Sequence, residues 1–175
     1  MNAAPWRLKM SEAVANRTRT MSRLIYGAVA LLVFVGDQVT KAWVEARIPE
    51  RAVVEVIPGF FNLTDVKNGG AAFGLFADSP APWKTTVLVL ISVALLASVA
   101  AVVWRTRHLS WEAGVGLPLI LGGAISNLVD RIRVGRVVDF LDFYVRDYHW
   151  YTFNLADSAI VLGAFLLILQ VIFAD

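Results

Sequence analysis

Four long apolar segments restrict the folds that this chain can adopt. They run from Leu24 to Trp43, from Trp83 to Trp104, from Trp111 to Val129 and from Phe153 to Phe173. Each is close to the ~20 residues that a helix needs to cross the hydrocarbon core of a bilayer. Because none of them has a continuous polar face, they fit a soluble helix bundle poorly. We therefore expect an all-α membrane protein with four transmembrane helices.

The composition agrees with a membrane protein and excludes several classes of function. Hydrophobic residues make up 58% of the 175 residues and charged residues 17%, against about 25% in soluble domains. The formal net charge is only +2 and no basic stripe with interleaved aromatics is present, so no nucleic-acid partner is expected. Without cysteine, the chain has no disulfide, no thiolate metal site and no cysteine nucleophile.

Tryptophans and basic residues indicate how the segments lie in the membrane. Tryptophan favours the membrane interface, and it stands at segment ends at Trp43, Trp83, Trp104, Trp111 and Trp150. The total count of Lys and Arg does not decide the orientation. The basic flank before the first segment does favour cytoplasmic termini, with loops 44–82 and 130–152 outside.

The N-terminal region, residues 1–23, is read as a polar cytoplasmic leader, and residues 24–175 as the membrane domain. A cleaved signal peptide is the alternative for the first segment. It is disfavoured because Asp37 and Lys41 follow without a small-residue cleavage site. Met21 is an alternative start of the chain.

The first outer loop has the pattern of a small β-sheet. Residues 53–57 are mostly β-branched, and Pro58-Gly59 supplies a turn. Residues 60–66 then alternate partly between apolar and polar side chains. We expect a small antiparallel sheet within about 44–82, lying on the outer surface of the membrane.

Polar side chains of the first and third segments gather at the ends assigned to the outside. A charge at mid-bilayer costs about 2.5–3.5 kcal/mol on insertion scales, so a charged residue in a membrane span indicates a structural or functional role. Asp37 and Lys41 lie one helical turn apart, and an ion pair that anchors the helix end explains them. The third segment carries one polar stripe, formed by Gly123, Asn127, Asp130 and Arg131. Helix packing explains the glycine, but it does not explain the amide and the charges.

Two further aspartates flank the fourth segment. Asn154 can cap this helix, and Asp157 then lies in the first turn, where the helix dipole favours a carboxylate. Capping is therefore a competing explanation for Asp157, beside a role in chemistry. Asp139 stands between Val138 and Phe140 in the second outer loop, where a lone aspartate is usually a solvated charge.

Few catalytic arrangements are available to such a chain. The two histidines, His108 and His149, fall in different loops, so no metal site is expected. A serine–lysine peptidase would pair Lys41 with Ser126 or Ser158. Two close carboxylates are the remaining arrangement, since one can activate water while the other donates a proton to the scissile carbonyl. That chemistry needs no cofactor.

From Ile25 onwards, five blocks resemble the bacterial lipoprotein signal peptidases, also called signal peptidase II. The blocks are Asp37-Gln38-Val39-Thr40-Lys41, Asn68-Gly69-Gly70-Ala71-Ala72-Phe73, Gly122-Gly123 through Asn127 to Asp130-Arg131, Val137-Val138-Asp139-Phe140, and Phe153-Asn154-Leu155-Ala156-Asp157-Ser158. Each block is weak alone, whereas five in order on a four-span frame are specific. Two departures are visible, namely Ser126 where the family usually has glycine and a longer polar leader.

The resemblance implies a membrane-embedded aspartyl endopeptidase of the inner membrane, in which the small outer β-sheet serves as a cradle for the substrate. Its substrates would be prolipoproteins, cut just before a cysteine that carries diacylglycerol. The implied catalytic pair is Asp139 and Asp157. The implied supporting or substrate-binding residues are Asp37, Lys41, Asn68, Asn127, Asp130, Arg131 and Asn154. Of the pair, we expect Asp139 to hold the shared proton and Asp157 to carry the charge. The alternative function is a small four-span transporter or assembly subunit that uses intramembrane carboxylates.

Overall fold

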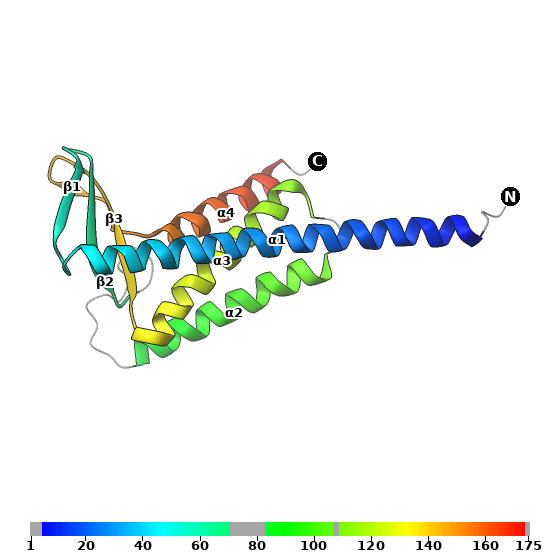
Figure 1. Ribbon diagram of the computed structural model, residues 1–175, viewed down its shortest axis with the longest axis horizontal. Coiled ribbons are helices and arrows are strands. Elements are labelled where there is room, and N and C mark those ends of the chain that lie inside the picture. Colours follow the sequence, from blue (N-terminus) through cyan, green and yellow to red (C-terminus); the bar gives the residue numbers. More distant parts are fainter. Residues whose placement is uncertain (1–4, 71–82, 107–108, 174–175) are drawn as a thin grey trace.

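Four long helices form the body of the molecule, and a small antiparallel sheet covers one end of it (Figure 1). The computed structural model describes residues 5–70, 83–106 and 109–173. Along the chain the elements are α1 (Pro5–Arg47), β1 (Val53–Ile57), β2 (Phe61–Asn68), α2 (Trp83–Arg105), α3 (Trp111–Val134), β3 (Val137–Val145), β4 (Tyr148–His149) and α4 (Leu155–Ile172).

All four helices are long and apolar enough to cross a membrane, which confirms the four expected spans. The spanning parts are Thr20–Arg47, Thr85–Arg105, Trp111–Val134 and Leu155–Ile172. Helix α1 also continues through the polar leader as far as Pro5 and projects beyond the other helices (Figure 1). Proline is compatible with the first position of a helix because its missing N–H has no intrahelical partner there.

Helix α3 is the centre of the bundle and packs against the other three helices. Of its spanning window 67% is buried, against 6% for α2, so α2 is the most lipid-exposed helix. Glycines allow α3 and α4 to touch through their backbones. A Cβ added to Gly163 of α4 would lie 2.5 Å from the carbonyl oxygen of Gly116 of α3.

The sheet has the strand order β1-β2-β3-β4, and its paired strands are antiparallel. Strands β1 and β2 lie within loop 44–82, as expected, and Gly59 (φ 76°) makes the turn between them. Strands β3 and β4 come from the second outer loop, which the sequence pattern did not indicate. Residues 71–82 lie outside the described residues, and they include Ala71–Phe73, the second half of the Asn68–Phe73 block that resembles signal peptidase II.

The sheet is fixed to the helices at two points. Val138 and Phe140 of β3 pack with Val44 and Ile48 at the end of α1. The backbone N–H groups of Phe140 and Leu141 donate to the carbonyl oxygen of Phe153, at 3.0 and 2.8 Å. Because Phe153 lies just before α4, these bonds hold strand β3 beside the N-terminus of that helix.

Candidate active site

All nine polar residues singled out from the sequence meet where the sheet joins the bundle. They come from five elements: Asp37 and Lys41 from α1, Asn68 from β2, Asn127, Asp130 and Arg131 from α3, Asp139 from β3, and Asn154 and Asp157 from the start of α4. Hydrogen bonds connect them into one network. Most of these side chains are buried, which makes unpaired polar atoms costly and the network correspondingly constrained.

Asp139 is 2% exposed and each of its carboxylate oxygens accepts one side-chain amide. Asn68 Nδ2 donates to Oδ2 at 2.8 Å, and Asn154 Nδ2 donates to Oδ1 at 2.7 Å. Burial, and secondly the negative charge of Asp157, raise the pKa of Asp139 to about 7, although the two amide donors oppose that rise. Asp139 is therefore suited to hold a proton near neutral pH.

Asp157 serves both as a helix cap and as a member of the network. Its backbone N–H donates to Asn154 Oδ1 at 2.9 Å, and its Oδ2 accepts from the backbone N–H of Asn154 at 3.3 Å, which makes a capping box. Its Oδ1 accepts from Asn127 Nδ2 at 2.8 Å. The capping interpretation is correct, but it accounts for one carboxylate oxygen and leaves the other for Asn127.

A single amide, that of Asn154, links the two aspartates. Its nitrogen donates to Asp139 and its oxygen accepts from the backbone of Asp157. Asn154 is fully buried, so its position is fixed by these partners. The electrostatic effect of Asp157 on Asp139 agrees with two carboxylates held near each other.

Lys41 is a buried cation that contacts Asp37 and Asp130. Its Nζ lies 2.6 Å from Asp37 Oδ2, 2.6 Å from Asp130 Oδ2 and 2.8 Å from Asn127 Oδ1. The expected i, i+4 ion pair with Asp37 is therefore present. An ammonium group has three donors, and here all three have acceptors. Asn127 carries the link onward, since its oxygen faces Lys41 and its nitrogen faces Asp157.

Asp37 connects α1 to two other helices. Its Oδ1 accepts from the backbone N–H of Ala156 at 2.9 Å, and its Oδ2 accepts from Ser126 Oγ at 2.7 Å. The first N–H groups of a helix have no intrahelical acceptor, so Asp37 satisfies one of them in α4. This bond fixes α4 one residue before Asp157.

Two further residues belong to the network and were not assigned from the sequence. Gln38 Nε2 donates to Ser126 Oγ at 2.9 Å and to Asp130 Oδ1 at 2.8 Å. The fully buried Ser126 thus bonds to both Gln38 and Asp37. An amide within an apolar span was the available signal for Gln38. For Ser126 the sequence suggested a candidate serine–lysine pair with Lys41 and a departure from the glycine of the resembling family, but not a bond to Asp37 or Gln38.

Arg131 lies at the edge of the network. It donates to the carbonyl oxygens of Asn127 at 3.3 Å and Gly70 at 3.2 Å, so it ties the end of the described outer loop to α3. Its charge interacts with those of Asp157 and Asp139. A cation at this edge can offset negative charge on the aspartate pair.

The geometry favours acid–base chemistry by two carboxylates over the serine–lysine alternative. The acceptors of Lys41 are Asp37, Asp130 and Asn127, so its ammonium is engaged with two carboxylates and is a poor base. Ser158 Oγ donates to the carbonyl oxygen of Asn154. Among residues 5–70, 83–106 and 109–173, no group of three His, Cys, Asp or Glu side chains is placed to hold a metal ion.

Comparisons with known proteins agree on one family. The model of the family described as signal peptidase (SPase) II matches residues 29–173. The chain is 47% identical to a lipoprotein signal peptidase of Solibacter usitatus, over 84% of this chain and 89% of that protein. It is 44% identical to a lipoprotein signal peptidase of Oleidesulfovibrio alaskensis, over 82% and 91%.

The fold is also similar to that of a bacterial membrane enzyme solved by the in meso method at 2.3 Å resolution. The TM-score is 0.76 at 30% identity, covering 85% of this chain and 87% of that one. A second bacterial membrane enzyme, solved by the same method at 1.9 Å, gives a TM-score of 0.75 at 29% identity, covering 86% and 94%.

Proposed function

The chain belongs to the signal peptidase II family, and from that premise we propose that Asp139 and Asp157 are its catalytic aspartates. The family comprises membrane aspartyl peptidases that remove signal peptides from prolipoproteins, and this chain is such a peptidase of the bacterial inner membrane. The observation that carries the residue assignment is the bridge through Asn154, which bonds to both aspartates. Because the chain belongs to a family of peptidases, we no longer consider the alternative of a small transporter or an assembly subunit.

In the proposed reaction Asp157 acts as the base and Asp139 as the acid. Asp157 takes a proton from a water molecule while the water oxygen attacks the carbonyl carbon of the scissile peptide. Asp139 donates its proton to the carbonyl oxygen, which gives a neutral tetrahedral diol. Asp157 then protonates the leaving nitrogen, the C–N bond breaks, and a diol hydroxyl returns its proton to Asp139.

The surroundings of the two carboxyl groups support this division of roles. Burial and the charge of Asp157 favour the protonated form of Asp139, whose pKa is raised to about 7. Asp157 lies in the first turn of α4, where the helix dipole favours negative charge. It also accepts from Asn127, which itself accepts from the ammonium of Lys41.

The other network residues act by holding this pair in place. Lys41, Asp37 and Asp130 form a buried cluster that fixes α1 against α3. Asn68 and Asn154 orient Asp139 from β2 and α4. Arg131, at the edge, offsets charge that develops on the pair.

The proposed substrate is a prolipoprotein whose cysteine already carries a diacylglyceryl group, with cleavage just before that cysteine. The site lies at the end of four apolar helices, so a lipid-linked segment can approach it from within the bilayer. Purified protein in detergent should therefore cleave a diacylglyceryl-modified precursor at least about tenfold faster than the unmodified precursor. Equal cleavage rates for the two precursors would show that the enzyme does not recognise the diacylglyceryl group.

The proposed topology has both termini in the cytoplasm and the sheet outside, with residues 1–23 as the cytoplasmic leader and 24–175 as the membrane domain. The basic flank before the first span supports this orientation. The chain contains no cysteine, so single cysteines report cleanly. In intact cells an impermeant thiol reagent should label Glu55→Cys in β1 and leave Thr106→Cys, after α2, unlabelled. The reverse pattern would invert the topology.

A further inference from the structure

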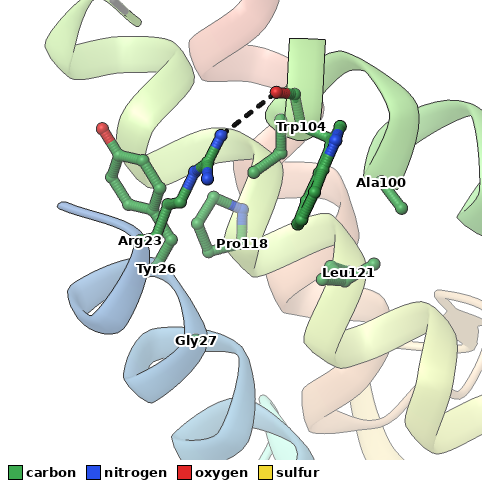
Figure 2. Close-up of a pocket in the computed structure, with 8 residues that line it drawn as sticks. Arg23, Tyr26, Gly27, Ala100, Trp104, Pro118 and Leu121 are labelled. Carbon is green, nitrogen blue, oxygen red and sulfur yellow. Dashed lines mark hydrogen bonds between the residues drawn. The ribbon is translucent and has the colours of Figure 1, made fainter. Parts of the chain in front are cut away.

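The end of the bundle away from the sheet contains a cavity of about 280 Å³ between α1, α2 and α3 (Figure 2). Its lining residues are Arg23, Tyr26 and Gly27 of α1, Ala100, Val103 and Trp104 of α2, and Pro118 and Leu121 of α3. Apart from the guanidinium of Arg23 and the hydroxyl of Tyr26, the lining side chains offer almost no polar group. The cavity is partly open to the surroundings of the helices, and this largely apolar lining favours an apolar occupant over water, which would find few polar partners there.

Arg23 provides a cation at one side of this cavity. Its guanidinium lies over the ring of Trp104, 4.8 Å from the ring centroid, and Nη2 donates to the carbonyl oxygen of Trp104 at 3.2 Å (Figure 2). A guanidinium carries five N–H donors, and this bond uses one. Arg23 is thus held in place by the aromatic ring and retains donors suited to a phosphate group.

The cavity runs from the interface level toward the hydrocarbon core. Trp104 is 73% exposed at the end of α2, a position typical of a tryptophan at the headgroup level. Gly27 lies four residues further along α1 than Arg23, which places it about 6 Å deeper at 1.5 Å per residue. Leu121 lies ten residues into α3 from Trp111, about 15 Å along that helix. The charge therefore lies at the shallow end and the apolar lining continues below it.

We propose that this cavity binds one phospholipid of the surrounding leaflet, with its phosphate on Arg23 and part of an acyl chain against Gly27, Pro118 and Leu121. The arrangement of charge and apolar surface matches that of a phospholipid, and the spanning helices place the cavity beside lipid. The occupant would link α1 to α2, both of which pack against α3. This site is separate from the aspartate network at the other end of the bundle.

Gly27 allows the cavity to be filled without disturbing the backbone. A Cβ at this position meets no heavy atom within 4 Å, so Gly27→Leu adds a side chain into open space. Ala28→Leu, at an exposed neighbouring position, is the matched control. Arg23→Gln removes the charge, and Arg105→Gln removes an exposed charge at the same end of α2.

The test uses the purified full chain in detergent and native mass spectrometry with two probes, phosphatidylglycerol and a diacylglycerol with the same acyl chains. We expect one phosphatidylglycerol per chain to bind the unaltered protein about tenfold more tightly than diacylglycerol. Gly27→Leu should lose this binding, and Arg23→Gln should reduce the preference for the phosphate-bearing probe. Ala28→Leu and Arg105→Gln should bind as the unaltered protein does.

Equal binding by Gly27→Leu and Ala28→Leu would overturn the proposal, because the bound lipid would then lie outside the cavity. Equal binding of the two probes would overturn the role of Arg23. Peptidase activity of Gly27→Leu in detergent should be unchanged, which also shows that the altered protein is folded.

Discussion

A Cβ added to Gly123 would lie 2.5 Å from the carbonyl oxygen of Ala156, so the backbones of α3 and α4 meet directly beside the proposed active site. Ala156 precedes Asp157, and its N–H is held by Asp37. The position of Asp157, one of the two proposed catalytic aspartates, thus depends on the absence of a side chain on the neighbouring helix.

Gly123→Ala should therefore displace the start of α4. Overpacking of this kind costs about 1–3 kcal/mol of stability. Because a small displacement of a catalytic group slows the chemical step, we expect activity to fall by about 10- to 100-fold. Gly36→Ala is the control, since its Cβ would meet Leu155 at an ordinary 3.5 Å. Similar activities for the two variants would show that the contact does not position Asp157.

Lys41→Met should destabilise the protein strongly. It leaves the buried carboxylates of Asp37 and Asp130 without their shared cation, and breaking a buried pair costs about 3–5 kcal/mol. Arg133→Met, which removes an exposed cation from α3, should change stability by about 0.5 kcal/mol or less. Unfolding in detergent measures both. A loss no larger than that of the control would mean that Lys41 contributes little to the fold.

Ser126→Ala tests the buried serine of α3 that bonds to Asp37 and Gln38 of α1. The change removes a hydroxyl that donates to Asp37 and accepts from Gln38, at a cost of about 1–3 kcal/mol. Ser98→Ala is the control, because Ser98 is an exposed serine of α2 that bonds to its own helix. If the two variants unfold alike, the hydroxyl of Ser126 is dispensable.

Much of this arrangement was predictable from local patterns. Four spans follow from the apolar segments, and the contact of Asp37 with Lys41 follows from i, i+4 spacing. Asn154 and Asp157 form the predicted cap because a helix N-terminus needs acceptors for its first N–H groups. These features depend on residues that are neighbours in the sequence.

Long-range pairing was not predictable in the same way. Strand β3 pairs with β2 across about seventy residues, as in the contact of Lys67 with Val138, and no local pattern specifies that partner. That pairing brings Asp139 beside Asn68 and changes it from an apparent loop aspartate into a buried one. The roles of Gln38 and Ser126 likewise depend on helix α1 meeting α3.

The pH dependence of activity should reflect the proton on Asp139. Its pKa is raised from 3.8 to about 7, so the protonated acid is lost as the pH rises through about 7. We expect kcat/KM to fall on the alkaline side of that value. A rate that stays constant well into the alkaline range would contradict the role of Asp139 as the acid.

Stability should follow the same titration. Because the pKa is higher in the folded than in the unfolded state, the folded state holds the proton more tightly. The proton on Asp139 therefore contributes to the free energy of unfolding. This contribution is fully present below pH 3.8, the pKa of the unfolded chain, and is lost as the pH rises through about 7. Asp139→Asn removes the titrating group and should flatten this decline, which unfolding at several pH values would measure.

The central claim is that Asp139 and Asp157 perform the hydrolysis, and the most direct measurement is cleavage of a lipid-modified prolipoprotein by Asp139→Asn and Asp157→Asn. Asparagine keeps the shape of the side chain and loses its ionisation. Asp142→Asn is the control, because Asp142 lies on the same strand but bonds to Asn62 and His149. We predict that each of the two variants, folded in the membrane, loses activity by about 10²–10⁴-fold, while the control remains active. Near-normal turnover by either folded variant would contradict the aspartyl pair.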